Sequence, residues 1–208
     1  RNVDKFPIKL KENTTLGHSI FDYNKVKKYR ILIPTINNNI LNLDKNGKSV
    51  FGWKYQNDNS QITSDLEHFK ISNKDFILFS TRIDVKLLAI NGSERFSFKT
   101  SLINSSLSRN NNGNLYGITD DFKLWQADIN GLSTFINLPG IDSLSNLTIN
   151  RVNNNIIYST GEKIKILDIN YQEILKYDFD SQVENIYYYK EYLIVKTKEN
   201  IYLLKDYK

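Results

Sequence analysis

The chain has 208 residues, of which 40% are hydrophobic and 12% aromatic, and its formal net charge is +5. This length and the wealth of aromatic residues suit one large all-β domain, because aromatic side chains favour pleated strands. The absence of cysteine excludes disulfides, thiolate metal sites and cysteine nucleophiles, and no apolar run reaches the roughly 20 residues that cross a bilayer.

The positive charge comes from scattered lysines rather than from one basic stretch. The densest cluster, residues 25–30, is typical of a solvated hairpin loop. We therefore expect no nucleic-acid partner and no membrane insertion by this segment. Because the chain contains no methionine, Arg1 is not a translational start, and we expect a longer precursor with any signal or anchor upstream.

Strand-like phrases recur in chain order. We predict blades over residues 15–55, 65–100, 102–138, 146–179 and 183–208. The expected strands are 19–23, 29–35, 39–44 and 49–55; 67–72, 75–82, 85–90 and 95–100; 102–108, 114–119, 123–128 and 133–138; 147–152, 156–160, 163–169 and 173–179; and 183–189, 192–197 and 200–205. The fifth blade lacks a fourth strand, and residues 4–10 have the character to supply it.

Turn signals separate the last two strands of each phrase. They are Asn46-Gly47, Asn91-Gly92, Asn130-Gly131 and Asn170-Tyr171, spaced by 45, 39 and 40 residues. Asn-Gly between apolar runs is typical of a type I′ hairpin, in which both central residues have positive φ. The period is that of a four-stranded propeller blade.

The predicted fold is therefore a single all-β domain, a five-bladed β-propeller of four-stranded antiparallel blades. The N-terminal strand at residues 4–10 closes the last blade, which removes an exposed sheet edge. The alternative is an arc cut from a ring of six to eight blades.

Five segments carry a resemblance to a known family. They are FPIKL (6–10), FDYN (21–24), YRILI (29–33), NLDKNGK (42–48) and GW (52–53). Together they resemble the C-terminal propeller of uncharacterised Bacteroidetes proteins with pyrroloquinoline-quinone-type or WD-like repeats. In that family the propeller follows a longer N-terminal region, often with a membrane anchor, which implies an extracytoplasmic location. The family has no assigned catalytic residues to transfer.

Three carboxylates on expected inner strands, Asp22, Glu67 and Glu184, are the candidate catalytic residues. Five-bladed glycosidases of the arabinanase and invertase type project such carboxylates into a central pocket. The Asp-Pro dipeptide usual on their first inner strand is absent here. The structural alternative is that Asp22 caps a turn and that Glu67 pairs with a lysine.

Metal-binding patterns are incomplete. His18 and His68 are the only histidines and lack zinc-site spacing. The segment Asp128-Ile-Asn130-Gly131, like Asp120-Asp121, lacks the remaining ligands of a calcium loop, and hairpin turn chemistry explains it without metal. We therefore predict no metal and no cofactor.

The longest predicted linkers, residues 57–64, 101–113 and 139–145, are the expected carriers of specificity. The predicted function is that of a monomeric, non-enzymatic module that contacts a protein or glycan through one loop face. Trp53 and Trp125 are the candidate aromatic anchors. The alternative is a small glycosidase-like enzyme that uses the three carboxylates.

Overall fold

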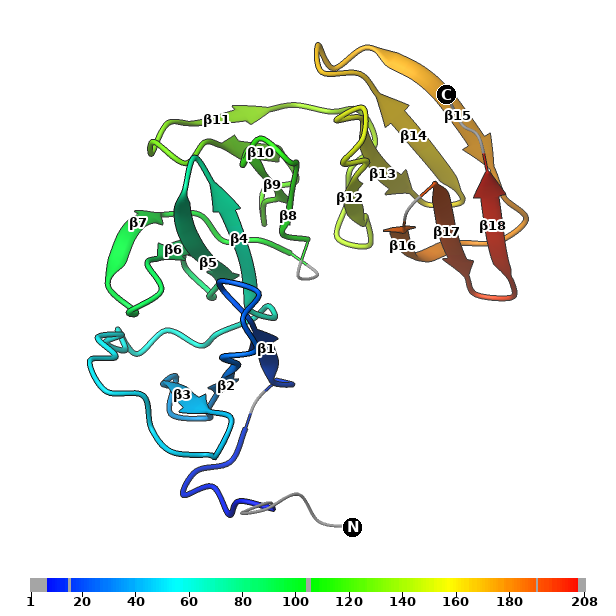
Figure 1. Cartoon of the computed structure of the whole chain (residues 1–208). Coiled ribbons are helices and arrows are strands. Elements are labelled where there is room, and N and C mark those ends of the chain that lie inside the picture. The colour runs from blue at the N-terminus through cyan, green and yellow to red at the C-terminus, as the bar shows by residue number, and fades with distance from the viewer. Residues whose placement is uncertain (1–6, 15, 104–105, 190, 206–208) are drawn as a thin grey trace. The chain divides into compact units, whose positions relative to one another are not determined.

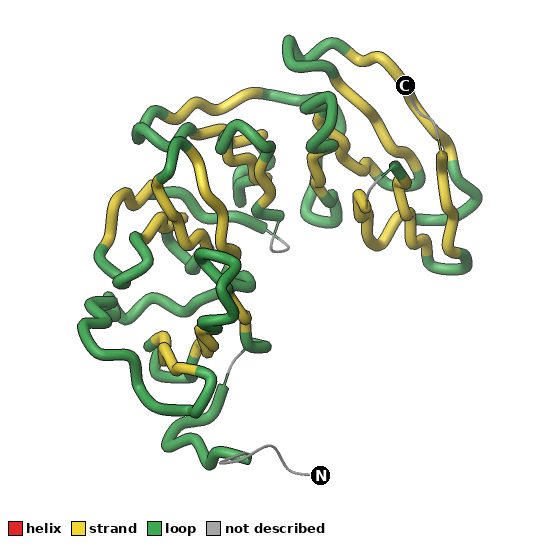
Figure 2. Tube along the Cα trace, in the orientation of Figure 1, coloured by secondary structure: helices red, strands yellow, loops and turns green. Residues whose placement is uncertain are grey.

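The computed structural model describes residues 7–14, 16–103, 106–189 and 191–205. It divides into two compact units, Arg1–Ser101 and Leu102–Lys208. The described residues form five antiparallel sheets and no helix, and each sheet pairs strands that are consecutive in the chain (Figures 1 and 2). No helix in this part of the chain is long and apolar enough to cross a membrane.

The first unit contains two sheets. The first has the order β1-β2-β3, with β1 Ser19–Phe21, β2 Arg30–Pro34 and β3 Ile40–Asp44. The second has the order β4-β5-β6-β7, with β4 Glu67–Ile71, β5 Lys74–Ser80, β6 Val85–Leu88 and β7 Glu94–Phe98.

The second unit contains three sheets. The first of them pairs β8 Ser108–Arg109, β9 Leu115–Ile118, β10 Leu124–Ala127 and β11 Ser133–Ile136. The next pairs β12 Leu147–Ile149, β13 Ile156–Thr160, β14 Lys163–Leu167 and β15 Glu173–Asp178. The last pairs β16 Val183–Tyr189, β17 Tyr192–Thr197 and β18 Ile201–Lys205.

Apolar side chains between successive sheets form the cores of both units. In the first unit, Leu32 of β2 and Ile77 and Phe79 of β5 belong to one cluster and are fully buried. Leu78 is also buried, although alternate side chains of a strand point to opposite faces. The continuous apolar run of β5 therefore fits a strand covered on both faces.

The turns differ in type from the prediction. Gly47, Gly92, Gly131 and Tyr171 have positive φ, but the preceding asparagines do not. A single left-handed residue is typical of a type I turn followed by a bulge, and the register indeed shifts at Leu88 and Leu167. In three of the turns an aspartate two residues before the asparagine accepts two backbone N–H groups: Asp44, Asp128 and Asp168. The prediction of type I′ hairpins is therefore wrong, although the turn positions are confirmed.

Several expected strands end earlier in the structure, and two are missing or much reduced. Residues 49–55 form no strand, because only the bridge between Leu43 and Ser49 continues the first sheet before the chain turns at Gly52. The expected strand at 102–108 is reduced to the two-residue β8 and an isolated bridge from Leu102 to Thr119.

Part of the predicted closing strand can be located. Residues 4–6 lie outside the described residues, and residues 7–10 are not in a strand. Ile8 lies against Gly47, where its side chain occupies the space that a Cβ atom would need. In the last sheet, β18 pairs with β17 along one edge. Closure by residues 4–10 and the single-domain organisation therefore stay predictions.

Candidate functional site

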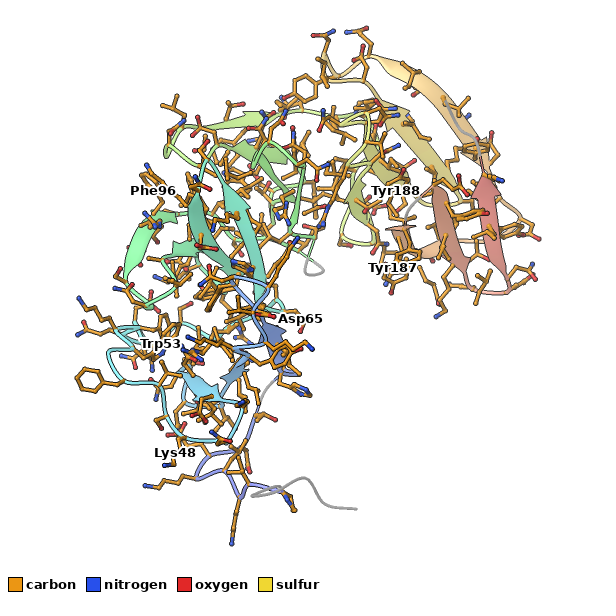
Figure 3. All side chains as sticks on the ribbon, viewed as in Figure 1. Lys48, Trp53, Asp65, Phe96, Tyr187 and Tyr188 are labelled. Atoms are coloured by element: carbon orange, nitrogen blue, oxygen red, sulfur yellow. The ribbon has the colours of Figure 1, made fainter. Side chains whose placement is uncertain are left out.

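The linker between β3 and β4 is held in place by aromatic side chains. The indole Nε1 of Trp53 donates a hydrogen bond to the carbonyl oxygen of Ile40 over 2.8 Å. The hydroxyl of Tyr55 reaches the carbonyl of Asn38 over 3.4 Å. Trp53 is labelled in Figure 3. Its indole thus occupies the Ile40 carbonyl of β3, a backbone acceptor that a fourth strand would otherwise use.

The β6–β7 turn packs directly on this linker. The Lys54 N–H donates to the carbonyl of Asn91 over 2.7 Å. A Cβ atom on Gly92 would lie 2.9 Å from the Trp53 ring and 2.7 Å from the Tyr55 nitrogen. Glycine is therefore needed at this position for its positive φ and for the close approach of the linker.

A cleft of about 780 Å³ opens along the linker within the first unit. Its lining residues are Trp53, Lys54, Tyr55, Gln56, Asn57, Asp58, Lys86, Leu88, Gly92, Ser93 and Glu94. The volume is within the range of small-ligand clefts, about 300–1,000 Å³. The site is built mostly from the linker and one turn, and only Lys86, Leu88 and Glu94 come from strands.

A buried lysine lies in the wall of this cleft. The Lys86 ammonium is 2.8 Å from Asp58, 3.0 Å from Glu94 and 3.2 Å from Asp84, and its side chain is only 5% exposed. Burial alone would lower the pKa of Lys86, but the hydrogen bonds to Asp58, Glu94 and Asp84 raise it well above the usual lysine value. Lys86 is therefore a charged structural group and no amine nucleophile at neutral pH.

Asp84 is the buried counter-charge. Its oxygens accept hydrogen bonds from Thr81 at 2.5 Å and Ser97 at 2.8 Å, and Lys99 lies 3.4 Å away. Burial raises the pKa of Asp84, but these hydrogen bonds and the Lys86 charge together outweigh it and lower the pKa. A general acid that works near neutral pH needs a raised pKa, so Asp84 is unsuited to that role.

A smaller pocket of about 180 Å³ adjoins Trp53. Its lining residues are Tyr23, Arg30, Asn42, Val50, Phe51, Gly52, Trp53, Ile90 and Asn91. Trp53 lines both this pocket and the cleft.

The two candidate anchors have different surroundings. Trp53 is partly exposed and lines the two cavities, as an aromatic anchor should. Trp125 of β10 is fully buried in the second unit, so its ring is unavailable to a partner. The structure therefore leaves Trp53 as the candidate anchor.

The three candidate catalytic carboxylates lie in separate local surroundings. Asp22 accepts hydrogen bonds from the backbone N–H groups of Val26 and Lys27, which is turn capping. Glu184 forms an ion pair with Lys196 at 2.6 Å. Glu67 is half-buried on β4. None of the three lines either cavity, and their catalytic role stays a prediction.

The described residues contain no cluster of three or more histidine, cysteine or carboxylate side chains that could hold a metal. His68 lies 2.9 Å from Asp75, and Asp121 pairs with Lys123. Asp128 uses one oxygen to cap its turn. The Lys86 network was missed in the sequence analysis. Its one signal in the sequence is a lysine inside the apolar strand Val85–Leu88.

Comparisons with known proteins identify the fold. No protein-family profile and no curated protein sequence match the chain. A catalytically inactive virginiamycin B lyase from Staphylococcus aureus, with quinupristin, has a TM-score of 0.63 and 13% identity, covering 88% of this chain and 64% of its own. BBS1N in complex with ARL6DN has a TM-score of 0.61 and 11% identity, covering 88% and 62%.

A third similar structure is PorZ of Porphyromonas gingivalis, described as an essential bacterial surface component of the type-IX secretion system. It has a TM-score of 0.56 and 12% identity, covering 86% of this chain and 24% of its own. The chain thus spans less than two thirds of each of these proteins. At this identity the likeness shows the fold alone: an all-β chain of β-propeller repeats.

Proposed function

We propose that the chain is a non-enzymatic binding module, a five-bladed propeller closed by its N-terminal segment, which contacts a partner protein through the linker face of its first unit. The observation that carries this proposal is the cleft of about 780 Å³ over residues 53–58. Linkers of a rigid all-β scaffold commonly carry recognition. Trp53 is the aromatic anchor, which is a residue type enriched in binding hot spots.

The charges around Lys86 support binding rather than catalysis. Each carboxylate around Lys86 is engaged by the ammonium, and Asp84 has a lowered pKa. Acid–base hydrolysis of a glycoside requires one carboxyl group with a raised pKa. The glycosidase-like alternative rests on Asp22, Glu67 and Glu184, and a hydrolase assay of their amide variants is its test.

Paired surface variants test the partner contact. Lys54 and Gln56 are exposed on the rim of the cleft, so Lys54→Glu with Gln56→Arg changes that rim without touching the core. Lys45→Glu with Gln61→Arg makes the same substitutions at exposed positions that do not line the cleft. In quantitative capture from the native organism, we expect the first pair of substitutions to reduce the amount of captured partner at least tenfold. The second pair should leave that amount unchanged. Equal retention by both pairs would assign the contact elsewhere.

We also propose that the module is monomeric and extracytoplasmic. Similarity to a surface component of a bacterial secretion system and to a propeller in a protein complex supports a surface-exposed binding role. Cell fractionation with an antibody against the chain tests the location, and recovery in the cytoplasm would contradict it.

A further inference from the structure

The small pocket beside Trp53 contains buried polar atoms that have no hydrogen-bond partner. Asn42 of β3 is only 5% exposed, and its Oδ1 has no partner among the described residues. The Tyr23 hydroxyl, in the same lining, is also buried and has no hydrogen-bond partner in the described part of the chain. An unpaired buried polar group costs about 1–3 kcal/mol, so native proteins rarely keep two together without a ligand or water.

The pocket also offers a cation, the guanidinium of Arg30. The Arg30 guanidinium makes one hydrogen bond, over 3.3 Å to the carbonyl of Tyr29, and no ion pair with a described residue. Burial raises the pKa of Tyr23 far above its usual value, with Arg30 opposing that shift. The phenol therefore stays protonated and able to donate a hydrogen bond, beside a guanidinium suited to a carboxylate.

Two aromatic rings complete the lining. Phe51 is 103% exposed, an unusual position for a phenylalanine. The indole N–H of Trp53 is already bound to the Ile40 carbonyl, so the side chain has no donor left and offers a ligand the π surface of its ring.

We propose that this pocket binds one acidic sugar ring, a hexuronate at the end of a glycan. The ring hydroxyls donate to Asn42 and accept from Tyr23, the carboxylate pairs with Arg30, and the C–H face of the sugar covers Phe51 and Trp53. A volume of about 180 Å³ limits the site to a single ring. This site shares Trp53 with the cleft but uses none of the other residues that line the cleft, and the proposal does not rest on the partner contact.

A peptide added as a strand fits this site less well. Two outward carbonyls of β3 are already used, because Val50 N–H donates to Asn42 at 2.9 Å and Trp53 donates to Ile40 at 2.8 Å. Strand addition needs such groups free.

The test is a titration of the whole chain with glucuronate and, as the neutral match, glucose, followed by calorimetry and by tryptophan fluorescence. We expect glucuronate to bind at least tenfold more tightly than glucose. Arg30→Gln should lower the affinity for glucuronate to that for glucose, and Phe51→Ala should lower the affinity for both sugars. Arg82→Gln and Phe135→Ala remove an exposed arginine and a half-exposed phenylalanine outside the pocket, and should change neither affinity.

Melting temperatures of all four variants check that each is folded. Glucuronate binding no tighter than that of glucose, or unchanged by Arg30→Gln, would overturn the proposal. Equal binding of acetate would show a carboxylate site without sugar recognition and would overturn it too. If a short acidic peptide bound more tightly than glucuronate, the ligand of the pocket would be a peptide and the sugar proposal would be wrong. None of these outcomes bears on the Lys54 and Gln56 variants, so the two proposals fail separately.

Discussion

The Lys86 ammonium lies 3.2 Å from the Asp84 carboxylate, and the two side chains are 5% and 0% exposed. Removing the cation alone would leave a buried carboxylate poorly compensated, which costs about 3–5 kcal/mol. We expect Lys86→Met to lower the free energy of unfolding by about that amount in urea titrations. Lys165 is the matched control, because it also pairs with a glutamate, Glu173, but is more exposed. Lys165→Met should cost about 0–1 kcal/mol, and similar losses in both variants would contradict the prediction.

The pH dependence of stability follows from the lowered pKa of Asp84. Because the folded pKa lies below the unfolded one, this carboxylate stabilises the fold above the ordinary aspartate pKa, about 3.9. That contribution is lost as the pH falls through the lower folded value. We expect Asp84→Asn to flatten the loss of unfolding free energy as the pH falls below about 5. An unchanged slope would show that other carboxylates govern acid unfolding.

At alkaline pH the lysine of the same cluster governs stability, and its pKa is shifted in the opposite direction to that of Asp84. Because the pKa of Lys86 is raised in the folded state, its contribution to the free energy of unfolding is complete below the ordinary lysine pKa, about 10.4. It is lost only as the pH rises through the still higher folded value. When the free energy of unfolding is measured at rising alkaline pH, it should therefore fall less steeply for Lys86→Met than for the unaltered chain.

Alanine substitutions at three glycines distinguish the cost of a positive φ from the cost of a steric clash. Gly92 has φ of +83°, and an added Cβ would lie 2.9 Å from the Trp53 ring. Gly52 has φ of +80° but nothing within 4 Å, and Gly17 has neither constraint. We expect Gly52→Ala to cost about 1 kcal/mol, Gly92→Ala distinctly more and Gly17→Ala nothing or a slight gain. Thermal unfolding measures the series, and equal costs at Gly92 and Gly52 would mean that the linker moves aside freely.

Asn42 and Asn150 are both 5% exposed but differ in hydrogen bonding. The Asn150 Oδ1 accepts the Val152 N–H at 2.9 Å, whereas the Asn42 Oδ1 has no hydrogen-bond partner among the residues that the structure describes. We expect Asn42→Leu to keep or raise the free energy of unfolding, because it removes an unsatisfied polar group. Asn150→Leu should lower it by about 1–3 kcal/mol. A loss at Asn42 equal to that at Asn150 would show that the Asn42 amide is satisfied in solution.

Ring closure can be tested by crosslinking, because the chain has no cysteine of its own. An antiparallel fourth strand would place Ile8 near Ile201 and Lys9 near Asn200. We expect disulfides to form on oxidation of Ile8→Cys with Ile201→Cys, or of Lys9→Cys with Asn200→Cys, and not of Lys9→Cys with Leu132→Cys. Failure of both test pairs would favour an open arc over the closed ring.

The strand positions could be predicted because their signals are local. Asn-Gly turns and apolar runs lie within about ten residues of the strands that they define, as at Gly131 between β10 and β11. The first sheet was harder, since the aromatic phrase from Phe51 to Tyr55 has the composition of a strand. Gly52 turns the chain away, and the Trp53 indole replaces a backbone donor.

The candidate site was less predictable for a physical reason. Lys86 is held by Asp58, which is 28 residues earlier and lies on a linker whose path depends on the Trp53 and Tyr55 hydrogen bonds. Sequence shows that a lysine interrupts an apolar strand but not which carboxylates surround it. The unpaired Asn42 gives no sequence signal at all, because its neighbours along β3 are ordinary strand residues.

Every described sheet joins only strands that follow one another along the chain. Such local pairing gives a low contact order for β structure, and low contact order speeds folding. Each sheet can therefore pair its own strands while later segments are still being made, and its apolar faces become buried when the neighbouring sheet follows. A pairing of residues 4–10 with β18 would have to wait until residues 201–205 have been made.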